Sequence, residues 1–272
     1  MHSATALRRE LAARNREIAV SANQLHDFTA GANPSVIFGS SARAHGNFHP
    51  RSYKNICANA QWAKRLTKVH TQSRKSLPRA EWRWRELDSS NSSDALLMNV
   101  FCYTRSVRNP KLSSMLGVVN GLKPEFGFRP RIPLLNGRFD RTEVDMKLGE
   151  LLVEAKLTET DFQTAPLRLI ERYRGIDEVF DLSMLSQSGA SIRGYQLVRG
   201  VLAAAATEGS FCVICDARRV DLIESWYSVM SAVQDCSLRC RLKLATWQEL
   251  SLALPKSLQQ FLTTKYGILT NQ

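Results

Sequence analysis

The stretch that most constrains the fold of this chain covers residues 141–159 and reads RTEVDMKLGELLVEAKLTE. Apolar and charged residues alternate on each side of Gly149-Glu150, and a period of two is expected of half-buried strands. A Gly at the first position of a two-residue loop favours a type II′ turn. The pattern therefore predicts a β-hairpin with one apolar face and one charged face.

The predicted turn fixes which side chains of this hairpin face each other. If Leu148 pairs with Leu151, Asp145 lies opposite Glu154 with Cβ atoms roughly 5 Å apart, and Glu143 lies opposite Lys156. Two carboxylates this close repel each other unless a cation lies between them, and oxygen ligands of this kind suit Mg²⁺ or Mn²⁺. A lysine on the same face can orient a water or offset charge on a phosphate. This combination is typical of metal-assisted phosphodiester hydrolysis.

These residues resemble the motif of the PD-(D/E)XK nuclease superfamily, which has the restriction-endonuclease-like fold. Asp145 matches the first acid, and Glu154-Ala155-Lys156 matches the E-x-K tripeptide, with eight residues between the two carboxylates. The resemblance implies an α/β fold with a central mixed β-sheet flanked by helices. It covers residues 92–217, including a helix from Asn91-Ser92, a three-stranded meander, a second helix and a fourth strand.

The resemblance also implies roles for individual residues. Asp145 and Glu154 would bind the metal, with the carbonyl of Ala155 as a further ligand. Lys156 would position or activate the attacking water and stabilise the phosphate, and Gln196 on the second helix would support it. The third acidic ligand stays open between Glu125 and Asp94, since Asp94 is also explained as a residue at the start of a helix.

Other interpretations of the same residues remain open. The hairpin can be an ordinary exposed one whose charges keep a sheet edge soluble, and Gln196 can be a surface residue of its helix. A zinc site formed by Cys212, Cys215, Cys236 and Cys240 is disfavoured, because residues three apart on a buried strand point to opposite faces. His45 and His49 are interpreted as loop residues.

The remaining patterns predict the order of the elements. Residues 5–20 form a helix, and residues 29–60 form an irregular loop or a mobile arm. Residues 126–135 form a strand, and Asn136-Gly137 turns it directly into the strand of Asp145. Residues 191–207 form the helix that carries Gln196.

The positive charge of the chain is concentrated near its N-terminus. The formal net charge is +12, and residues 1–90 hold fifteen Lys and Arg against six Asp and Glu. Such a bias favours a polyanionic partner, although a solvated basic surface is the alternative. We predict a basic N-terminal extension at residues 1–88 and a nuclease-like domain at residues 89–272. The predicted nucleic-acid contacts are Lys64, Arg65, Lys68, Arg74, Lys75 and Arg199.

The sequence thus predicts a Mg²⁺- or Mn²⁺-dependent nuclease that hydrolyses phosphodiester bonds, with DNA favoured over RNA as substrate. The alternative is a catalytically silent nucleic-acid-binding protein with the same fold. A homodimer is compatible with the sequence. No apolar run approaches the ~20 residues of a membrane helix, and no signal peptide is evident, so a cytoplasmic location is expected.

Overall fold

A computed structural model describes residues 3–30, 33–41, 44–69 and 84–269. The chain divides into two compact units, which we call the sheet unit, Leu116–Thr246, and the helical unit, His2–Met115 with Trp247–Gln272. The predicted domain boundary after residue 88 falls inside the helical unit. Arg74 and Lys75 lie outside the described residues.

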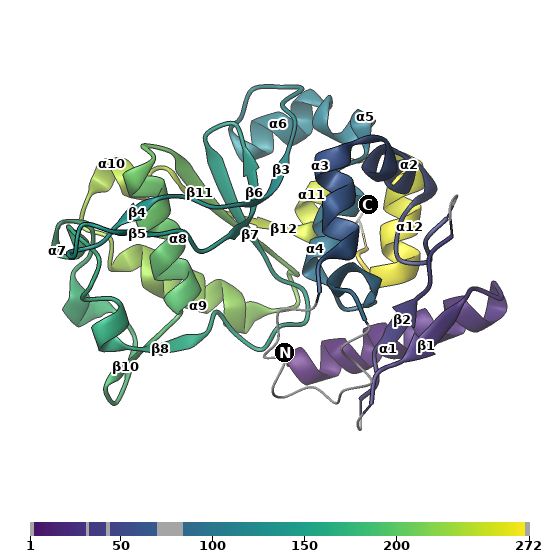
Figure 1. The fold of residues 1–272 in the computed structure, drawn as a ribbon, viewed down its shortest axis with the longest axis horizontal. Coiled ribbons are helices and arrows are strands. Elements are labelled where there is room, and N and C mark those ends of the chain that lie inside the picture. The colour runs from purple at the N-terminus through teal and green to yellow at the C-terminus, as the bar shows by residue number, and fades with distance from the viewer. Residues whose placement is uncertain (1–2, 31–32, 42–43, 70–83, 270–272) are drawn as a thin grey trace. The chain divides into compact units, whose positions relative to one another are not determined.

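The sheet unit contains a central mixed sheet of five strands in the order β12-β11-β7-β6-β3 (Figure 1). β3, β6 and β7 form an antiparallel meander, and β11 is parallel to both β7 and β12. This arrangement confirms the predicted α/β fold with a mixed sheet flanked by helices. The strands are β3 (Glu125–Phe128), β6 (Val144–Leu148), β7 (Leu151–Ala155), β11 (Ser210–Cys215) and β12 (Leu242–Thr246).

Helices α8 (Tyr195–Ala206) and α9 (Val220–Ser231) pack against the sheet through a continuous apolar core. α8 approaches β11 closely, because a Cβ atom at Gly200 would lie 2.2 Å from the ring of Phe211. That ring meets Trp226 of α9 edge to face, with 5.5 Å between the centroids. A glycine in α8 therefore sets how tightly this helix packs on the sheet.

Shorter elements complete the sheet unit. The predicted helix at residues 191–207 begins only at Tyr195, because Gly194 has a left-handed φ of 75° and the preceding residues form strand β10. The short elements are β4 (Ile132–Pro133), β5 (Phe139–Asp140), β8 (Thr164–Pro166), η4 (Leu167–Leu169), α7 (Ile176–Val179), η5 (Leu182–Met184), β9 (Gln187–Ser188), β10 (Ser191–Arg193) and α10 (Cys236–Arg239).

The meander differs from its prediction in one respect. The predicted strand at residues 126–135 is split into β3 and β4, and Asn136-Gly137 connects β4 to β5 in a separate two-stranded sheet. β6 still pairs with β3, at Phe126↔Met146. The local turn signal was correct, but the prediction that it leads directly into the strand of Asp145 was wrong.

The helical unit is built around α4 (Ser93–Phe101), whose residues are all buried. Its N-cap is Ser92, whose side chain accepts a hydrogen bond from the N–H of Ala95 at 3.1 Å. The other elements are α1 (Ala4–Ser21), β1 (His26–Phe28), β2 (Val36–Phe38), α2 (Pro50–Ala58), α3 (Ala60–Ala63), η1 (Lys64–Thr67), η3 (Glu86–Asp88), α5 (Thr104–Val107), α6 (Pro110–Leu116), α11 (Trp247–Ser251) and α12 (Lys256–Tyr266).

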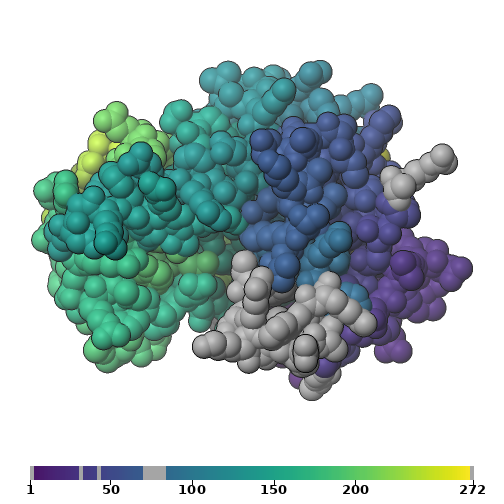
Figure 2. Space-filling model, in the orientation of Figure 1, coloured from purple at the N-terminus to yellow at the C-terminus, as the bar shows by residue number. Residues whose placement is uncertain are grey.

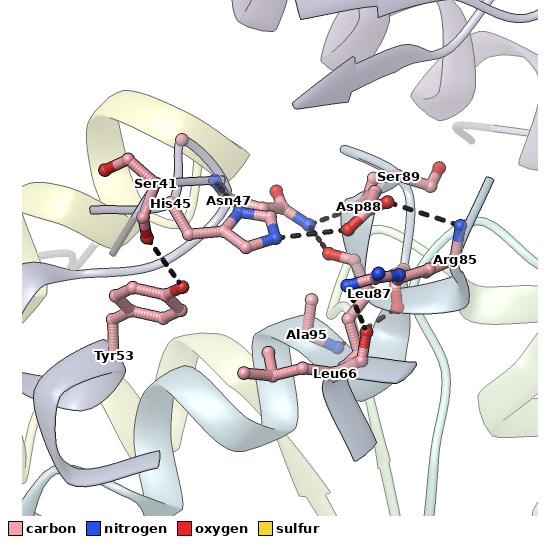
Figure 3. Close-up of polar contacts among 12 residues, drawn as sticks. Ser41, His45, Asn47, Tyr53, Leu66, Arg85, Leu87, Asp88, Ser89 and Ala95 are labelled. Carbon is pink, nitrogen blue, oxygen red and sulfur yellow. Dashed lines mark hydrogen bonds and ion pairs between the residues drawn. The ribbon is translucent and has the colours of Figure 1, made fainter. Parts of the chain in front are cut away.

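Residues 29–60 are therefore more ordered than their Gly-, Asn- and Ser-rich composition predicts. His49 is the N-cap of α2. His45 is buried, accepts a hydrogen bond from the N–H of Asn47 at Nδ1, and contacts Asp88 through Nε2 at 3.2 Å (Figure 3). Because Nδ1 is an acceptor, Nε2 carries the proton and donates to Asp88. The side-chain amide of Asn47 donates to the carbonyls of Leu87 and Ser89 at 2.7 Å, so these contacts join the loop to η3.

Candidate active site

The β6–β7 hairpin forms with the register that the sequence predicts. Leu148 pairs with Leu151, and Met146 pairs with Val153. Gly149 has a φ of 62°, whereas Glu150 is not among the residues with positive φ, which is the combination of a type II′ turn. A non-glycine residue at position 149 would be strained in this conformation.

The regular ladder between β6 and β7 ends where the two acids begin. In an unbroken ladder, the N–H of Ala155 would bond to the carbonyl of Val144. Instead it donates to the carboxylate of Asp145 at 2.7 Å. Asp145 therefore replaces a main-chain acceptor at the end of β6, and this bond fixes one of its oxygens beside β7.

Glu154 of β7 and Lys156, which directly follows this strand, form a buried ion pair. The Lys156 ammonium lies 2.7 Å from Oε1 of Glu154. The two residues are only 3% and 6% exposed. Charged side chains are rarely buried unless they are paired. The contact between Glu154 and Lys156 therefore explains why both charges can be buried here.

Two further carboxylates surround Lys156. Burial disfavours its charged form, but the charges of Glu154, Glu159 and Asp145 outweigh burial and raise the pKa of Lys156 above its ordinary value. Nζ also lies 5.6 Å from the ring centroid of Phe162. The negative charges of three carboxylates therefore favour the ammonium form of Lys156.

Glu159 was not predicted as a site residue, although it lies within residues 141–159. Its carboxylate accepts the N–H of Leu157 at 2.6 Å. The fully buried guanidinium of Arg219 donates to the carbonyls of Glu159 and Thr160 at 2.7 and 3.0 Å. Arg219 follows β11, sixty residues away in sequence from Glu159, so no local pattern could have predicted this support.

Gln196 and Arg199 lie in the first two turns of α8. The N–H of Gln196 donates to the carbonyl of Phe162 at 3.0 Å, and the ring of Phe162 faces Lys156. Arg199 is 7% exposed and donates to the carbonyl of Glu143 at 3.4 Å. α8 thus contacts the neighbourhood of both Asp145 and Lys156, while nucleic-acid binding by Arg199 stays a prediction.

The two candidates for a third acidic ligand are placed differently. Glu125 lies on β3, is exposed and pairs with Lys147 of β6. Because Lys147 and Asp145 are two residues apart on β6, Glu125 lies on the same sheet face as Asp145. Asp94 belongs to α4 of the helical unit and pairs with Arg65 at 2.5 Å. Metal binding by Glu125 stays a prediction.

Of the predicted nucleic-acid contacts in residues 61–69, only Lys64 is exposed. Arg65 is 9% exposed and engaged with Asp94. Lys68 lies 3.0 Å from Glu86 and 3.6 Å from Asp94. Two of these three cations thus have structural partners that the sequence did not reveal.

The donors at the site suit a hard divalent cation. Mg²⁺ is commonly held by one or two carboxylates, with waters and substrate phosphates completing its shell, and Asp145, Glu154 and the carbonyl of Ala155 offer oxygen only. Within the described ranges, no three His, Cys, Asp or Glu side chains are placed to hold a metal as a set. Cys212 and Cys215 are buried in β11, whereas Cys236 and Cys240 are exposed.

The mixed sheet, the acid at the end of β6 and the E-x-K tripeptide of β7 together define a protein of the restriction-endonuclease-like class. The chain belongs to the family described as "Restriction Endonuclease associating with ARP", whose model matches residues 22–267. A comparison with curated proteins found no match, and neither did one with solved structures. None of the helices in the described part of the chain is long and apolar enough to cross a membrane.

Proposed function

We propose that the protein is a metal-dependent nuclease that hydrolyses phosphodiester bonds of DNA, acting as an endonuclease in the cytoplasm. The family supports nuclease activity. The observation that carries the proposal is the buried Glu154–Lys156 pair, with Asp145 fixed beside it on the neighbouring strand. A hairpin that served only to keep a sheet edge soluble would place its charges in water rather than bury them.

Each residue of the site has a proposed role in the reaction. Asp145 and Glu154 hold the cation, with Ala155 as a main-chain ligand. A bound Mg²⁺ or Mn²⁺ would polarise a phosphoryl oxygen and lower the pKa of a bound water. Lys156 donates hydrogen bonds to the attacking water or to the phosphate, where negative charge increases in the transition state. Gln196 supports Lys156 from α8.

A cleavage assay tests the proposal. Purified protein is incubated with supercoiled, linear and single-stranded DNA and with RNA, in Mg²⁺, Mn²⁺ or EDTA. We expect cleavage of DNA that requires the metal and falls at least ~100-fold in Lys156→Ala, the size of effect seen when one transition-state donor is removed. Asp145→Asn is expected to lose both activity and metal binding, measured by calorimetry.

Lys147→Ala provides the matched control. Lys147 lies on β6, two residues from Asp145, and its ammonium is 4.8 Å from the ring centroid of Phe128. We expect this variant to keep its activity. Full activity in Lys156→Ala or Asp145→Asn would contradict the site. DNA binding without cleavage, together with no Mg²⁺ or Mn²⁺ binding, would make the silent nucleic-acid-binding protein the better account.

A further inference from the structure

The β4–β5 hairpin is an insertion between the first two strands of the meander, and it carries a dense set of arginines. A third segment lies beside it, because Leu134 pairs with Tyr173, the N–H of Leu135 donates to the carbonyl of Arg172, and the N–H of Arg174 donates to the carbonyl of Pro133. We call residues 129–141 together with residues 172–174 the arginine hairpin. Figure 1 shows β4 and β5 beside α8, and in Figure 2 teal atoms of this part of the chain lie on the face toward the viewer.

The exposed charge of the arginine hairpin is positive. Its only carboxylate, Asp140, is 7% exposed. Within two residues of the arginine hairpin along the chain, the acids are Glu143, which lies 3.8 Å from Arg129, and the exposed Glu171. Six exposed cations outnumber them, all of them arginines: Arg129, Arg131, Arg138, Arg141, Arg172 and Arg174.

The buried carboxylate of Asp140 has hydrogen-bond donors and a cation around it. It accepts hydrogen bonds from the hydroxyl and N–H of Thr142 at 2.5 and 2.7 Å and from the hydroxyl of Tyr173. Arg172 lies 3.6 Å away. Burial would raise the pKa of Asp140, but the hydrogen bonds from Thr142 and Tyr173 outweigh burial and hold the pKa below its ordinary value. Asp140 is thus a support for the hairpin and leaves its outer surface basic.

The same network connects the hairpin to the active site. Tyr173 gives its only hydroxyl proton to Asp140, so the hydroxyl of Tyr195 donates to Tyr173 across 3.1 Å. Tyr195 begins α8, where Arg199 contacts the carbonyl of Glu143, two residues before Asp145. The hairpin is therefore held by packed side chains at a fixed position relative to β6.

An exposed apolar side chain marks the tip of the hairpin. Leu135 is 66% exposed, and the nearby Phe139 is 39% exposed with the guanidinium of Arg131 4.3 Å from its ring centroid. Arginine binds phosphate through a planar fork of donors and also stacks on flat rings. Arginines around an apolar tip therefore suit a phosphate backbone with bases and sugars beside it.

We propose that the arginine hairpin is a DNA-contacting element that holds the phosphates of a DNA duplex beside Asp145, Glu154 and Lys156. This inference rests on the proposed nuclease function and names the surface that presents the substrate to that site. It assigns substrate contact to the sheet unit, in addition to the basic residues of the N-terminal third.

Binding of the full-length protein to a fluorescent 30-base-pair duplex, followed by anisotropy in EDTA over a series of salt concentrations, tests the proposal. Arg131→Ala/Arg138→Ala removes two exposed cations. We expect the duplex to bind about 10- to 60-fold more weakly at 0.1 M salt, with the slope of log K against log salt shallower by about 1.8. The control is Lys123→Ala/Arg193→Ala, which removes two exposed cations of the sheet unit outside the hairpin.

We expect the control to bind almost as tightly as the wild type. Wild-type affinity and slope in Arg131→Ala/Arg138→Ala, or an equal loss in the control, would overturn the inference. Because binding is measured in EDTA, its outcome is separate from that of cleavage. If the arginine-hairpin variant binds DNA more weakly but the wild type does not cut DNA, only the proposed nuclease function is overturned. If the wild type cuts DNA but the variant binds DNA as tightly as the wild type, only this inference is overturned.

Discussion

The sheet unit and the helical unit each bury a lysine, and the two lysines differ in what surrounds them. Lys156 of the sheet unit is 6% exposed and faces the carboxylate of Glu154 at 2.7 Å. Lys265 of the helical unit is 2% exposed and donates to the neutral oxygens of Asn15 and Gly46 at 2.8 and 3.1 Å. Carboxylates raise the pKa of Lys156, whereas burial lowers the pKa of Lys265 well below its ordinary value.

The difference separates the ion pair of the candidate active site from a lysine whose contacts are structural. Lys265 belongs to α12, and Asn15 of α1 both accepts a hydrogen bond from its side-chain nitrogen and donates one to its carbonyl at 3.0 Å. The side-chain nitrogen of Lys265 lies 3.7 Å from the ring centroid of Phe38. This lysine joins two helices without any carboxylate. The pair of Glu154 and Lys156 instead buries two opposite charges, and charge that is buried at a cost is typical of functional sites.

The largest expected effect is on stability, and it tests whether Lys156 and Glu154 depend on each other. Lys156→Met leaves a buried carboxylate without its partner, and removing one partner of such a pair costs about 3–5 kcal/mol. Glu154→Gln/Lys156→Met is expected to recover much of this loss. Urea unfolding of the two single variants and the double variant measures the coupling, and additive effects would show that the pair is not a unit.

The next effect is on catalysis and compares the two lysines directly. Lys156→Met is expected to lower the initial rate of DNA cleavage by about 10²–10³ per folded molecule, since one transition-state donor is removed. Lys265→Met makes the same Lys-to-Met replacement at the other buried lysine. This variant is expected to cut DNA at nearly the wild-type rate. The assay is run well below the melting temperature of each variant. Similar losses in both variants would break the distinction between the two lysines.

The local geometry of the candidate active site could be predicted from the sequence. The β6–β7 hairpin and the pairing of Leu148 with Leu151 are confirmed. They were predictable because strand alternation and a glycine turn depend only on a few neighbouring residues. The place where the ladder ends could not be predicted, because it depends on Asp145 competing with a main-chain carbonyl for the N–H of Ala155.

Long-range partners account for most of what sequence reasoning missed. The prediction that Arg65 contacts nucleic acid rests on its charge, which is visible in the sequence, and it stays a prediction. Its partner Asp94, twenty-nine residues later, could not be predicted from local pattern. The Asn136-Gly137 turn was recognised, but which strands it joins depends on β3 pairing with β6 across the inserted hairpin. Local propensity cannot distinguish these alternatives.

A pH series gives a smaller effect and tests the state of Lys265. Below a pH of about 10.5 and above the lowered pKa, the unfolded chain binds a proton at Lys265 that the folded chain does not, so stability rises with pH in this window. The difference in unfolding free energy between wild type and Lys265→Met should change by up to about 1.4 kcal/mol per pH unit. Urea unfolding at pH 8, 9 and 10 measures it. A constant difference would mean that Lys265 keeps its proton.

The smallest expected effect on stability is at Lys64, an exposed lysine, in contrast to the two buried lysines. Lys64 contacts the side chain of Gln61 at 3.5 Å and is exposed, so Lys64→Ala should change the unfolding free energy by less than about 0.5 kcal/mol. If it contacts a phosphate, the slope of log K for DNA against log salt should become shallower by about 0.9. Arg65→Ala, the buried neighbour, should instead destabilise the protein by breaking its pair with Asp94. Anisotropy and urea unfolding of both variants separate DNA binding from stability. A large loss of stability in Lys64→Ala would show that this exposed lysine contributes to folding, which would contradict the prediction.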